Sequence, residues 1–341
     1  MIANALIVNS AGLGDGLIEI PFLKNMADVA PRVRFYHTGS TVFSDKTFTN
    51  AANLTTLLGT VPSAWRTFED KEWPAIRAFV VANNIDLIIN LRNFGPAHDG
   101  GYFAFKQTSP PGVAFWNYRF DGRHGECGNI RTQMRELLSS RGVINASLNS
   151  LSLRDAVRAE YMSRKPSGIA INIHAGNVFK LWPDWKWRIL CQELVEKEHL
   201  KVFAGHGDIE NRRAADLVRQ VDAHRPGAAK LIQCPDILTA VGEVASSRCV
   251  VTVDSWMLHA AAGLGVRAVG LYIVTSPLTW GGDTDHCVSI ESNHLRRCER
   301  FDPLIGLCRN HYRECPLIER EGDGIDVKDV LDLLSGCTTL S

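Results

Sequence analysis

The chain has 341 residues, 45% of them hydrophobic and 22% charged, and its 37 basic residues balance 37 acidic ones. This composition is typical of a soluble globular protein, and the length predicts two domains. A net charge of zero excludes a global field that would attract nucleic acid, so any anion site must be local. No apolar run approaches the ~18 residues of a membrane span, and no signal peptide opens the chain. We therefore expect a cytoplasmic protein whose nine cysteines are mostly reduced.

The first predicted strand, residues 5–8, ends in a glycine-rich turn, GLGDG at positions 12–16, before a helix that we expect to be interrupted near Pro21. A dinucleotide fingerprint needs a further glycine at position 17, where Leu17 stands, so a nicotinamide cofactor is disfavoured. The glycines still let a ligand approach the backbone closely and leave Asp15 on an exposed turn. Asp15 is therefore a candidate functional carboxylate, and a helix cap is the alternative.

Further strands are expected at 33–36 and 87–91, the second after a helix near residues 73–83. The segment 95–123 is loop-rich and places cations beside aromatic rings, as with Arg119 and Trp116. Such a composition suits a sugar or a phosphate-bearing acceptor, although ordinary surface loops often share it. The residues that we assign to an acceptor loop are Gly14, Arg92 and Arg119.

The second half begins at a domain boundary marked by the turn signal PSG at 166–168, followed by a predicted strand at 168–173. Lys180 lies on the loop after this strand, where an ammonium can reach a phosphate as a point charge, and a solvated surface lysine is the alternative. The next strand, 201–204, leads to Gly205 and to Glu210 at the start of another helix.

The stretch 250–272 is predicted to form a strand–helix–strand unit of a parallel sheet. Asp254, Ser255 and His259 lie where its first strand meets its helix. Ligands of open α/β sheets bind at the carboxyl ends of strands, and a helix N-terminus presents free N–H groups to an anion such as phosphate. The alternatives are that Asp254 or Ser255 is only the N-cap, and that His259 is buried among alanines.

Near the C-terminus, four cysteines fall within 29 residues without a C-x-x-C spacing: Cys287, Cys298, Cys308 and Cys315. They are a weak candidate for a structural zinc or iron site, and reduced thiols are favoured. A final amphipathic helix is expected at 327–334.

Four pieces of the sequence together resemble the bacterial heptosyltransferases, glycosyltransferase family nine. They are the turn at 12–16, the segment KLWP at 180–183, Gly205 with Glu210, and DSWMLHAA at 254–261. The resemblance implies an α/β fold of the GT-B type, with two Rossmann-like, doubly wound domains that face a central cleft. The implied domains are an acceptor domain at 1–165, a nucleotide-sugar domain at 166–320, and a C-terminal helix at 321–341 that packs back on the N-domain.

The family further implies inverting, metal-independent transfer of a sugar, usually a heptose from an ADP-linked donor, to an acceptor hydroxyl. No cofactor is required for catalysis, although some protein-modifying relatives hold iron near the cysteine segment. The resemblance assigns Asp15 as the base and Glu210 to the ribose. It assigns to the donor diphosphate Lys180, Asp254, Ser255, Trp256 and His259. Because Trp256 replaces the family's glycine, the donor's nucleotide and sugar stay open.

The expected partners are a nucleotide-sugar donor and an acceptor that is a glycan, a protein or a small metabolite, and no nucleic acid. Two other functions fit the same residues. One is a nucleotide-sugar epimerase or hydrolase, in which Asp15 and His259 act on the donor itself. The other is a non-catalytic subunit that binds a nucleotide sugar.

Overall fold

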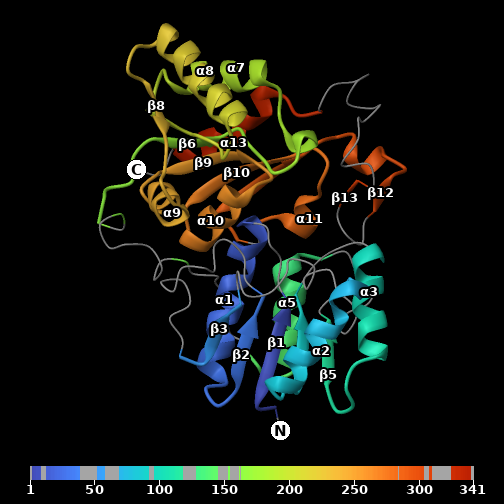
Figure 1. Ribbon diagram of the computed structural model, residues 1–341. Helices are drawn as coiled ribbons and strands as arrows, with labels where there is room; N and C mark the ends of the chain where they lie inside the picture. The colour runs from blue at the N-terminus through green and yellow to red at the C-terminus, as the bar shows by residue number, and fades with distance from the viewer. Residues whose placement is uncertain are drawn as a thin grey trace. The chain divides into compact units, whose positions relative to one another are not determined.

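Two parallel sheets organise the chain in the computed structural model, one in each of its two units, Met1–Leu151 and Ser152–Ser341 (Figure 1). Among the described helices, none has both the length and the hydropathy to cross a membrane. The structure describes residues 2–8, 13–38, 52–57, 69–91, 96–117, 128–144, 153, 161, 163–282, 284–302, 307–308 and 324–338.

The first unit has a five-stranded sheet whose strands pair in parallel, in the order β3-β2-β1-β4-β5. Its central strands carry apolar runs that are buried on both faces, as is usual where helices cover a parallel sheet. The strands predicted at 5–8, 33–36 and 87–91 are confirmed to within one residue. The bounds are β1 Asn4–Val8, β2 Arg34–His37, β3 Leu54–Thr56, β4 Leu87–Asn90 and β5 Ala114–Asn117.

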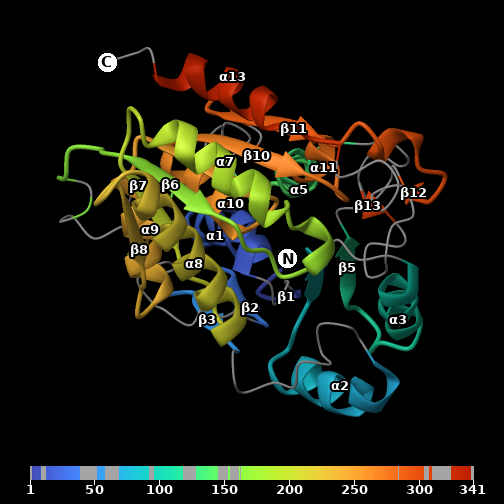
Figure 2. The same ribbon diagram turned by 90° about the horizontal axis from the view of Figure 1, so that it is seen from above.

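The helices of this unit cover both faces of the sheet, with α2 on one face and α1 on the other (Figure 2). Ile76 and Val80 of α2 pack with Leu6 and Val8 of β1 in one apolar cluster. The bounds are α1 Leu13–Val29, η2 Asp70–Glu72, α2 Trp73–Ala82, α3 Pro96–Gln107 and α5 Ile130–Ser140.

Two expectations for this unit are wrong. The first helix is not interrupted at Pro21, because α1 runs on through it with Phe22 and Leu23 buried beside it, and this burial outweighs the backbone hydrogen bond that proline cannot make. The segment expected to be loop-rich contains α3 and β5, since Phe105 is fully buried against Trp73 and Phe115.

The second unit has a six-stranded parallel sheet, in the order β11-β10-β9-β6-β7-β8. The strands predicted at 168–173, 201–204 and 250–253 are confirmed to within a residue. The bounds are β6 Ile169–Asn172, β7 Leu200–Phe203, β8 Ala229–Ile232, β9 Cys249–Val253, β10 Arg267–Tyr272 and β11 Cys287–Glu291, and a short antiparallel pair follows, β12 Phe301–Asp302 and β13 Leu307–Cys308.

Helices cover both faces of this sheet as well, with α7 and α8 on one face and α9 and α10 on the other (Figure 1). The bounds are η4 Val178–Lys180, α7 Asp184–Leu194, α8 Asp208–His224, α9 Ile237–Ala245, α10 Trp256–Leu264, α11 Pro277–Trp280, η5 Leu295–Arg297 and α13 Val327–Thr338.

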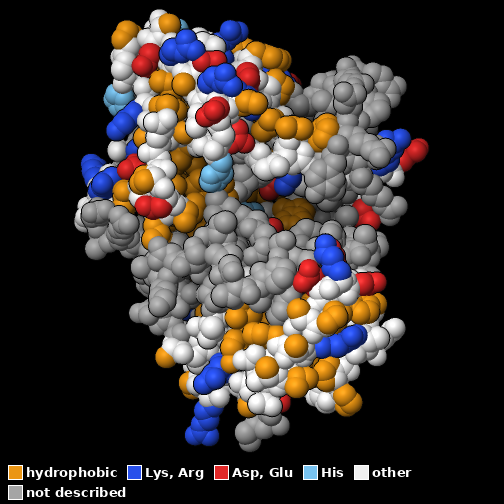
Figure 3. Space-filling model, viewed as in Figure 1, with side chains coloured by type: hydrophobic (Ala, Val, Ile, Leu, Met, Phe, Trp, Pro, Cys, Tyr) orange, Lys and Arg blue, Asp and Glu red, His pale blue; other side chains and the backbone are white. Residues whose placement is uncertain are grey.

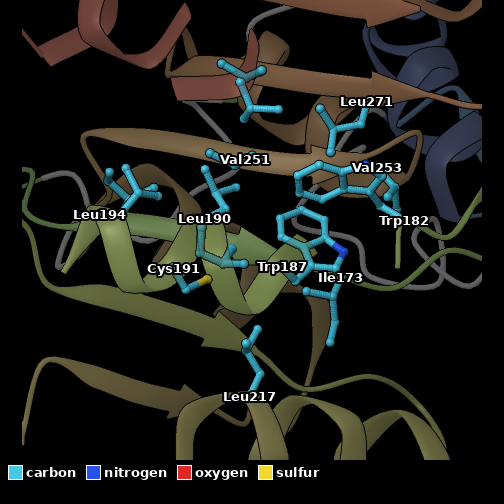
Figure 4. Close-up of a cluster of buried hydrophobic side chains, with 14 of the residues drawn as sticks. Ile173, Trp182, Trp187, Leu190, Cys191, Leu194, Leu217, Val251, Val253 and Leu271 are labelled. Carbon is cyan, nitrogen blue, oxygen red and sulfur yellow. The ribbon is translucent and has the colours of Figure 1, made fainter. Parts of the chain in front are cut away.

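The largest buried side chains of the second unit are Trp182 and Trp187, which meet edge to face with ring centroids 5.1 Å apart (Figure 4). They lie between α7 and the sheet, beside Val253 of β9 and Leu271 of β10. Burial of the two indoles anchors the segment after Lys180 to the sheet, because a buried aromatic side chain generally removes roughly 150–250 Å² of surface from water.

The division between the units falls earlier than the boundary expected at 165/166. Leu153 N donates to the Gly263 carbonyl oxygen at 2.7 Å, and Tyr161 packs so closely on Gly242 that a Cβ there would lie 2.4 Å from its ring. Residues 152–165, which the turn signal at 166–168 assigned to the first domain, therefore belong to the second unit. A turn signal marks a change of direction and does not report which core the preceding residues join.

The C-terminal helix is attached to the second unit by its described contacts, and its packing back on the N-domain stays a prediction. α13 packs on α7, β10 and β11, and its Val330 and Leu334 are buried in that unit's core. Just before it, the Ile325 carbonyl oxygen accepts hydrogen bonds from Trp182 Nε1 at 3.2 Å and Lys186 Nζ at 2.7 Å. An amphipathic pattern predicts an apolar face without saying which surface covers it.

We expect Lys186→Met to loosen this C-terminal attachment. The substitution keeps the buried aliphatic stem but removes a charge-assisted hydrogen bond, which costs about 1.5–3 kcal/mol of unfolding free energy. Urea unfolding measures the loss. The control is Lys328→Met on the exposed side of α13, which we expect to leave the midpoint unchanged. Equal stability of the two variants would contradict this account of the attachment.

Candidate functional site

The carboxyl edge of the second sheet gathers the polar residues that the sequence singled out. Because β6, β7, β9 and β10 are parallel, the segments that follow them meet at one edge. Lys180 follows β6, Glu210 follows β7, and Asp254 follows β9. The structure also adds Thr275, which follows β10.

Asp254 is the most tightly held of these residues. Its Oδ2 atom accepts a hydrogen bond from Lys180 Nζ at 2.7 Å and another from Thr275 Oγ1 at 2.6 Å. The Asp254 side chain is only 5% exposed, while Lys180 is 24% exposed. Lys180, Asp254 and Thr275 therefore join the loops after β6, β9 and β10. The ammonium of Lys180 remains partly exposed at this edge.

The protonation of Asp254 reflects these contacts. Burial alone would raise the pKa of its carboxyl, but the Lys180 ammonium, the hydrogen bonds from Lys180 and Thr275, and the nearby His259 outweigh burial and hold the pKa below its usual range. Asp254 is thus an anion that stabilises the position of Lys180.

Ser255 is the N-cap of α10, as the capping alternative expected, since its Oγ accepts from Met257 N at 3.4 Å. A buried amide beneath it fixes the cap: Asn172 Nδ2 lies 2.8 Å from Ser255 Oγ and 3.0 Å from Thr252 Oγ1. The start of α10 is therefore tied to the ends of β6 and β9. Its remaining N–H groups have the orientation that favours an anion.

The two other predicted residues on α10 differ in exposure. His259 is 4% exposed, so it is buried, as the alternative expected, and it also helps to lower the pKa of Asp254. Trp256 is half-buried at the first position of the helix, with its ring 6.5 Å from that of Phe203 at the end of β7. An indole thus occupies the surface where the family has a glycine.

Glu210 folds back over Gly205, and this contact explains the spacing of the two residues. Its Oε2 accepts from His206 N at 2.7 Å and from Gly207 N at 3.4 Å, which satisfies donors at the start of α8. A Cβ at position 205 would lie 2.3 Å from both Cβ and Oε2 of Glu210. Only glycine therefore leaves room for the carboxylate at this strand end.

His174 is a residue of this edge that the sequence analysis did not single out. It lies two residues after the end of β6 and is 7% exposed, yet neither Nδ1 nor Nε2 has a hydrogen-bond partner within the described part of the protein. Burial lowers the pKa of its imidazole from 6.5 to about 4, more than the opposing effect of Glu210. The one feature of the sequence that could have identified His174 was its place at the carboxyl end of a predicted strand.

In the first unit, Asp15 lies half-buried in the first turn of α1, with Gly14 before it. An acidic side chain there is stabilised by the helix dipole, so the capping alternative and a catalytic role both stay open. Arg92 and Arg119 lie outside the described residues.

The cysteine segment does not form a metal centre among the residues that the structure describes. Cys287 is on β11, Cys298 follows η5, and Cys308 on β13 is buried in the apolar core. No group of three or more His, Cys, Asp or Glu side chains able to hold a metal ion occurs in the described ranges. Cys315 lies outside them, so the four-cysteine site stays a prediction.

Charge on the surface is mixed. Figure 3 shows Lys, Arg, Asp and Glu side chains interspersed over the described residues of one face. This agrees with the balanced composition.

Comparison with known proteins gives the following matches. The model of glycosyltransferase family 9 (heptosyltransferase) matches residues 136–303. The chain is similar in structure to the E. coli heptosyltransferase WaaC with ADP, with a TM-score of 0.66 and 13% identity over 98% of this chain and 100% of that chain. The family 9 glycosyl transferase of Veillonella parvula DSM 2008 gives a TM-score of 0.64 and 13% identity over 99% and 98% of the two chains.

A third solved structure is the dodecameric iron-containing heptosyltransferase TibC of enterotoxigenic E. coli in complex with ADP-D-β-D-heptose. Its TM-score is 0.52 and its identity 10%, over 98% of this chain and 76% of that chain. Curated proteins give no match. At such identities the structural likeness establishes the fold, which is GT-B with two Rossmann-like units.

We expect Thr275→Val to weaken the hold on Asp254. Loss of a hydrogen bond to a buried carboxylate costs about 1.5–3 kcal/mol of unfolding free energy at pH 7. Because the folded-state pKa of Asp254 is depressed, its contribution to stability is present above the unfolded pKa, near 3.9, and is lost as pH falls through the folded value. The substitution raises that folded value toward the unfolded one, so Thr275→Val starts from a lower stability at pH 7, loses less of it on acidification, and completes the loss at a higher pH.

Urea unfolding between pH 7 and pH 3 measures both effects. Thr275→Ser retains the hydroxyl and is the matched control, which we expect to follow the wild-type profile. An unchanged acid profile in Thr275→Val would show that this hydroxyl does not hold Asp254.

Proposed function

We propose that the chain, whose residues 136–303 match the model of glycosyltransferase family 9 (heptosyltransferase), transfers a sugar, most simply a heptose, from a nucleotide-diphosphate donor to an acceptor hydroxyl. The reaction inverts the anomeric carbon and needs no catalytic metal ion. The observation that carries this proposal is the Lys180–Asp254 ion pair at the N-terminus of α10. ADP is the favoured nucleotide, since two of the similar structures contain ADP or ADP-D-β-D-heptose.

The leaving group of such a reaction is a diphosphate, and its developing charge must be stabilised. Lys180 supplies a cation with three N–H donors, of which Asp254 takes one. The N-terminus of α10 supplies backbone N–H groups and the positive end of a helix dipole. A cation and oriented dipoles can together do what a divalent metal ion does in other transferases.

Asp254 plays a different part from the one that the resemblance gave it. A buried carboxylate repels phosphate, so we assign it to hold Lys180 in place rather than to bind the diphosphate itself. Ser255 fixes the start of α10, and His259 acts electrostatically on Asp254. Phosphate binding then falls to Lys180 and to the backbone.

The nucleoside side of the donor is assigned to Glu210 and Trp256. One carboxylate oxygen of Glu210 already accepts from His206 N, which orients the other toward a ribose hydroxyl in this proposal. Trp256, braced by Phe203, adds bulk beside the start of α10 and is the residue we expect to influence which donor fits. If the enzyme uses a donor other than an ADP-sugar, we expect Trp256 to be the cause of that preference.

Asp15 is proposed as the general base. It takes the proton of the acceptor hydroxyl as that oxygen attacks the anomeric carbon, while the bond from the anomeric carbon to the diphosphate oxygen breaks and its electron pair leaves with the nucleotide. Support for this role comes from the half-buried carboxylate in the first turn of α1. The acceptor is a glycan, a protein or a small metabolite.

We expect Asp15→Ala to lower kcat about 10²–10⁴-fold, the usual contribution of general-base catalysis, while the Kd for ADP stays near the wild-type value. The assay follows ADP release from ADP-D-β-D-heptose with a panel of lipopolysaccharide-core, protein and small-molecule acceptors. Asp28→Ala, an exposed aspartate at the other end of α1, is the control and should keep full turnover. Normal turnover in Asp15→Ala would refute the assigned base, and acceptor-independent release of altered sugar would indicate an epimerase or hydrolase.

We expect Lys180→Ala to weaken ADP binding about 10- to 100-fold, since a hydrogen bond to a charged group contributes about 1.5–3 kcal/mol. The measurement is the ligand-induced rise in melting temperature with ADP, GDP, UDP and CMP, which removes the effect of the variant's own lower stability. Lys197→Ala, an exposed lysine after α7, is the control and should respond to ADP as the wild type does. Failure of every nucleotide to stabilise the wild type would count against a donor site at this edge.

A further inference from the structure

His174 stands at a position that the fold controls closely. Asn172 holds its backbone in both directions: Asn172 Nδ2 donates to the His174 carbonyl oxygen at 2.9 Å, and His174 N donates to Asn172 Oδ1 at 3.3 Å. The same amide nitrogen contacts the Ser255 cap. The place of His174 at the sheet edge is therefore fixed relative to the start of α10.

The imidazole, by contrast, has no hydrogen-bond partner among the described residues. Both ring nitrogens are buried, and the side chain is more than nine-tenths buried. An unsatisfied buried polar group destabilises a folded protein, whereas an apolar ring of similar shape would not. Phenylalanine at this position would therefore remove no side-chain hydrogen bond that the described residues make.

The surroundings indicate what the imidazole can bind. The charged groups that act on it are Glu210 and Arg213 of α8 and Asp184 of α7, and burial keeps the ring neutral at pH 7. A neutral imidazole offers one donor and one acceptor. Phosphate oxygens only accept, so a phosphate would satisfy one nitrogen, while a pair of vicinal hydroxyls both donates and accepts.

We propose that His174 binds the ribose hydroxyls of the donor nucleotide together with Glu210, and that this contact makes the site selective for a ribonucleotide. The two residues come from adjacent strands, β6 and β7, and both lie on the side of the edge away from β10. Lys180, in the same loop as His174, then contacts the diphosphate. This inference rests on the proposed function.

The decisive variant is His174→Phe, compared with wild type for binding of ADP, 2′-deoxy-ADP and 3′-deoxy-ADP by calorimetry. The wild type should bind ADP about tenfold more tightly than at least one deoxy analogue, the effect of one hydrogen bond of about 1.4 kcal/mol. His174→Phe should bind ADP about tenfold more weakly and should lose that discrimination. The melting temperature of the variant without nucleotide should be equal to or above that of the wild type, a result that a merely structural histidine would not give.

Two further variants serve as controls, one for the hydrogen-bonding groups of the imidazole and one for the replacement of a buried histidine. His174→Gln keeps a donor and an acceptor and should recover part of the discrimination. His37→Phe replaces another fully buried histidine, whose pKa burial also lowers to about 4, in the other unit, and should leave ADP affinity unchanged.

The failures are distinguishable. If the wild type binds no nucleotide, the proposed function itself is wrong. If the wild type binds ADP but His174→Phe binds it equally well, or binds it less well with discrimination unchanged, the ribose contact is wrong while the donor site stands.

Discussion

The ion pair between Lys180 and Asp254 is the contact on which the rest of the second unit's edge depends. A carboxylate that is 5% exposed is stable as an anion only when it is paired and hydrogen-bonded, and Asp254 receives both the ammonium and the Thr275 hydroxyl. These three residues follow three neighbouring strands, β6, β9 and β10. Their contact therefore fixes the loops that surround the start of α10.

Much of the fold could be predicted because apolar runs and turn signals are local properties of the sequence. The strands around Leu6, Ile88, Ile171 and Val251 are continuous apolar runs, and they lie where the sequence indicated. The helix α3 and strand β5 were missed, because the glycines and prolines near them outweighed the apolar residues Phe103, Phe105 and Phe115. The surface that covers α13 could not be assigned from the sequence for a related reason: an apolar stripe on a helix carries no record of the surface that covers it.

The site could be predicted in part, and the missing part has a common physical cause. Lys180, Glu210 and Asp254 belong to short segments with recognisable residues. Asn172, His174 and Thr275 act only through partners that are distant in sequence, as when the Asn172 amide reaches Ser255 across 83 positions. No local pattern encodes such contacts, and their one signal is a place at the carboxyl end of a parallel strand. A polar residue at such a place therefore merits the same attention as a motif.

The two kinds of polar group at this edge meet different demands on a nucleotide-sugar site. Lys180 is already paired, so its position needs little reorganisation when a diphosphate arrives, and preorganised charge is what stabilises a leaving group most effectively. His174 has the opposite character, since its ring nitrogens lack a partner among the described residues and gain one only from a ligand. A site with such a group rejects an analogue that lacks the matching hydroxyl more strongly than an apolar pocket can, because the analogue leaves the buried group unsatisfied. In the proposed enzyme, Lys180 thus provides affinity for the diphosphate, and His174 of the same loop provides selectivity for the nucleoside. The selectivity arises because the unpartnered imidazole destabilises the free protein and is satisfied only by a ligand with the matching hydroxyl.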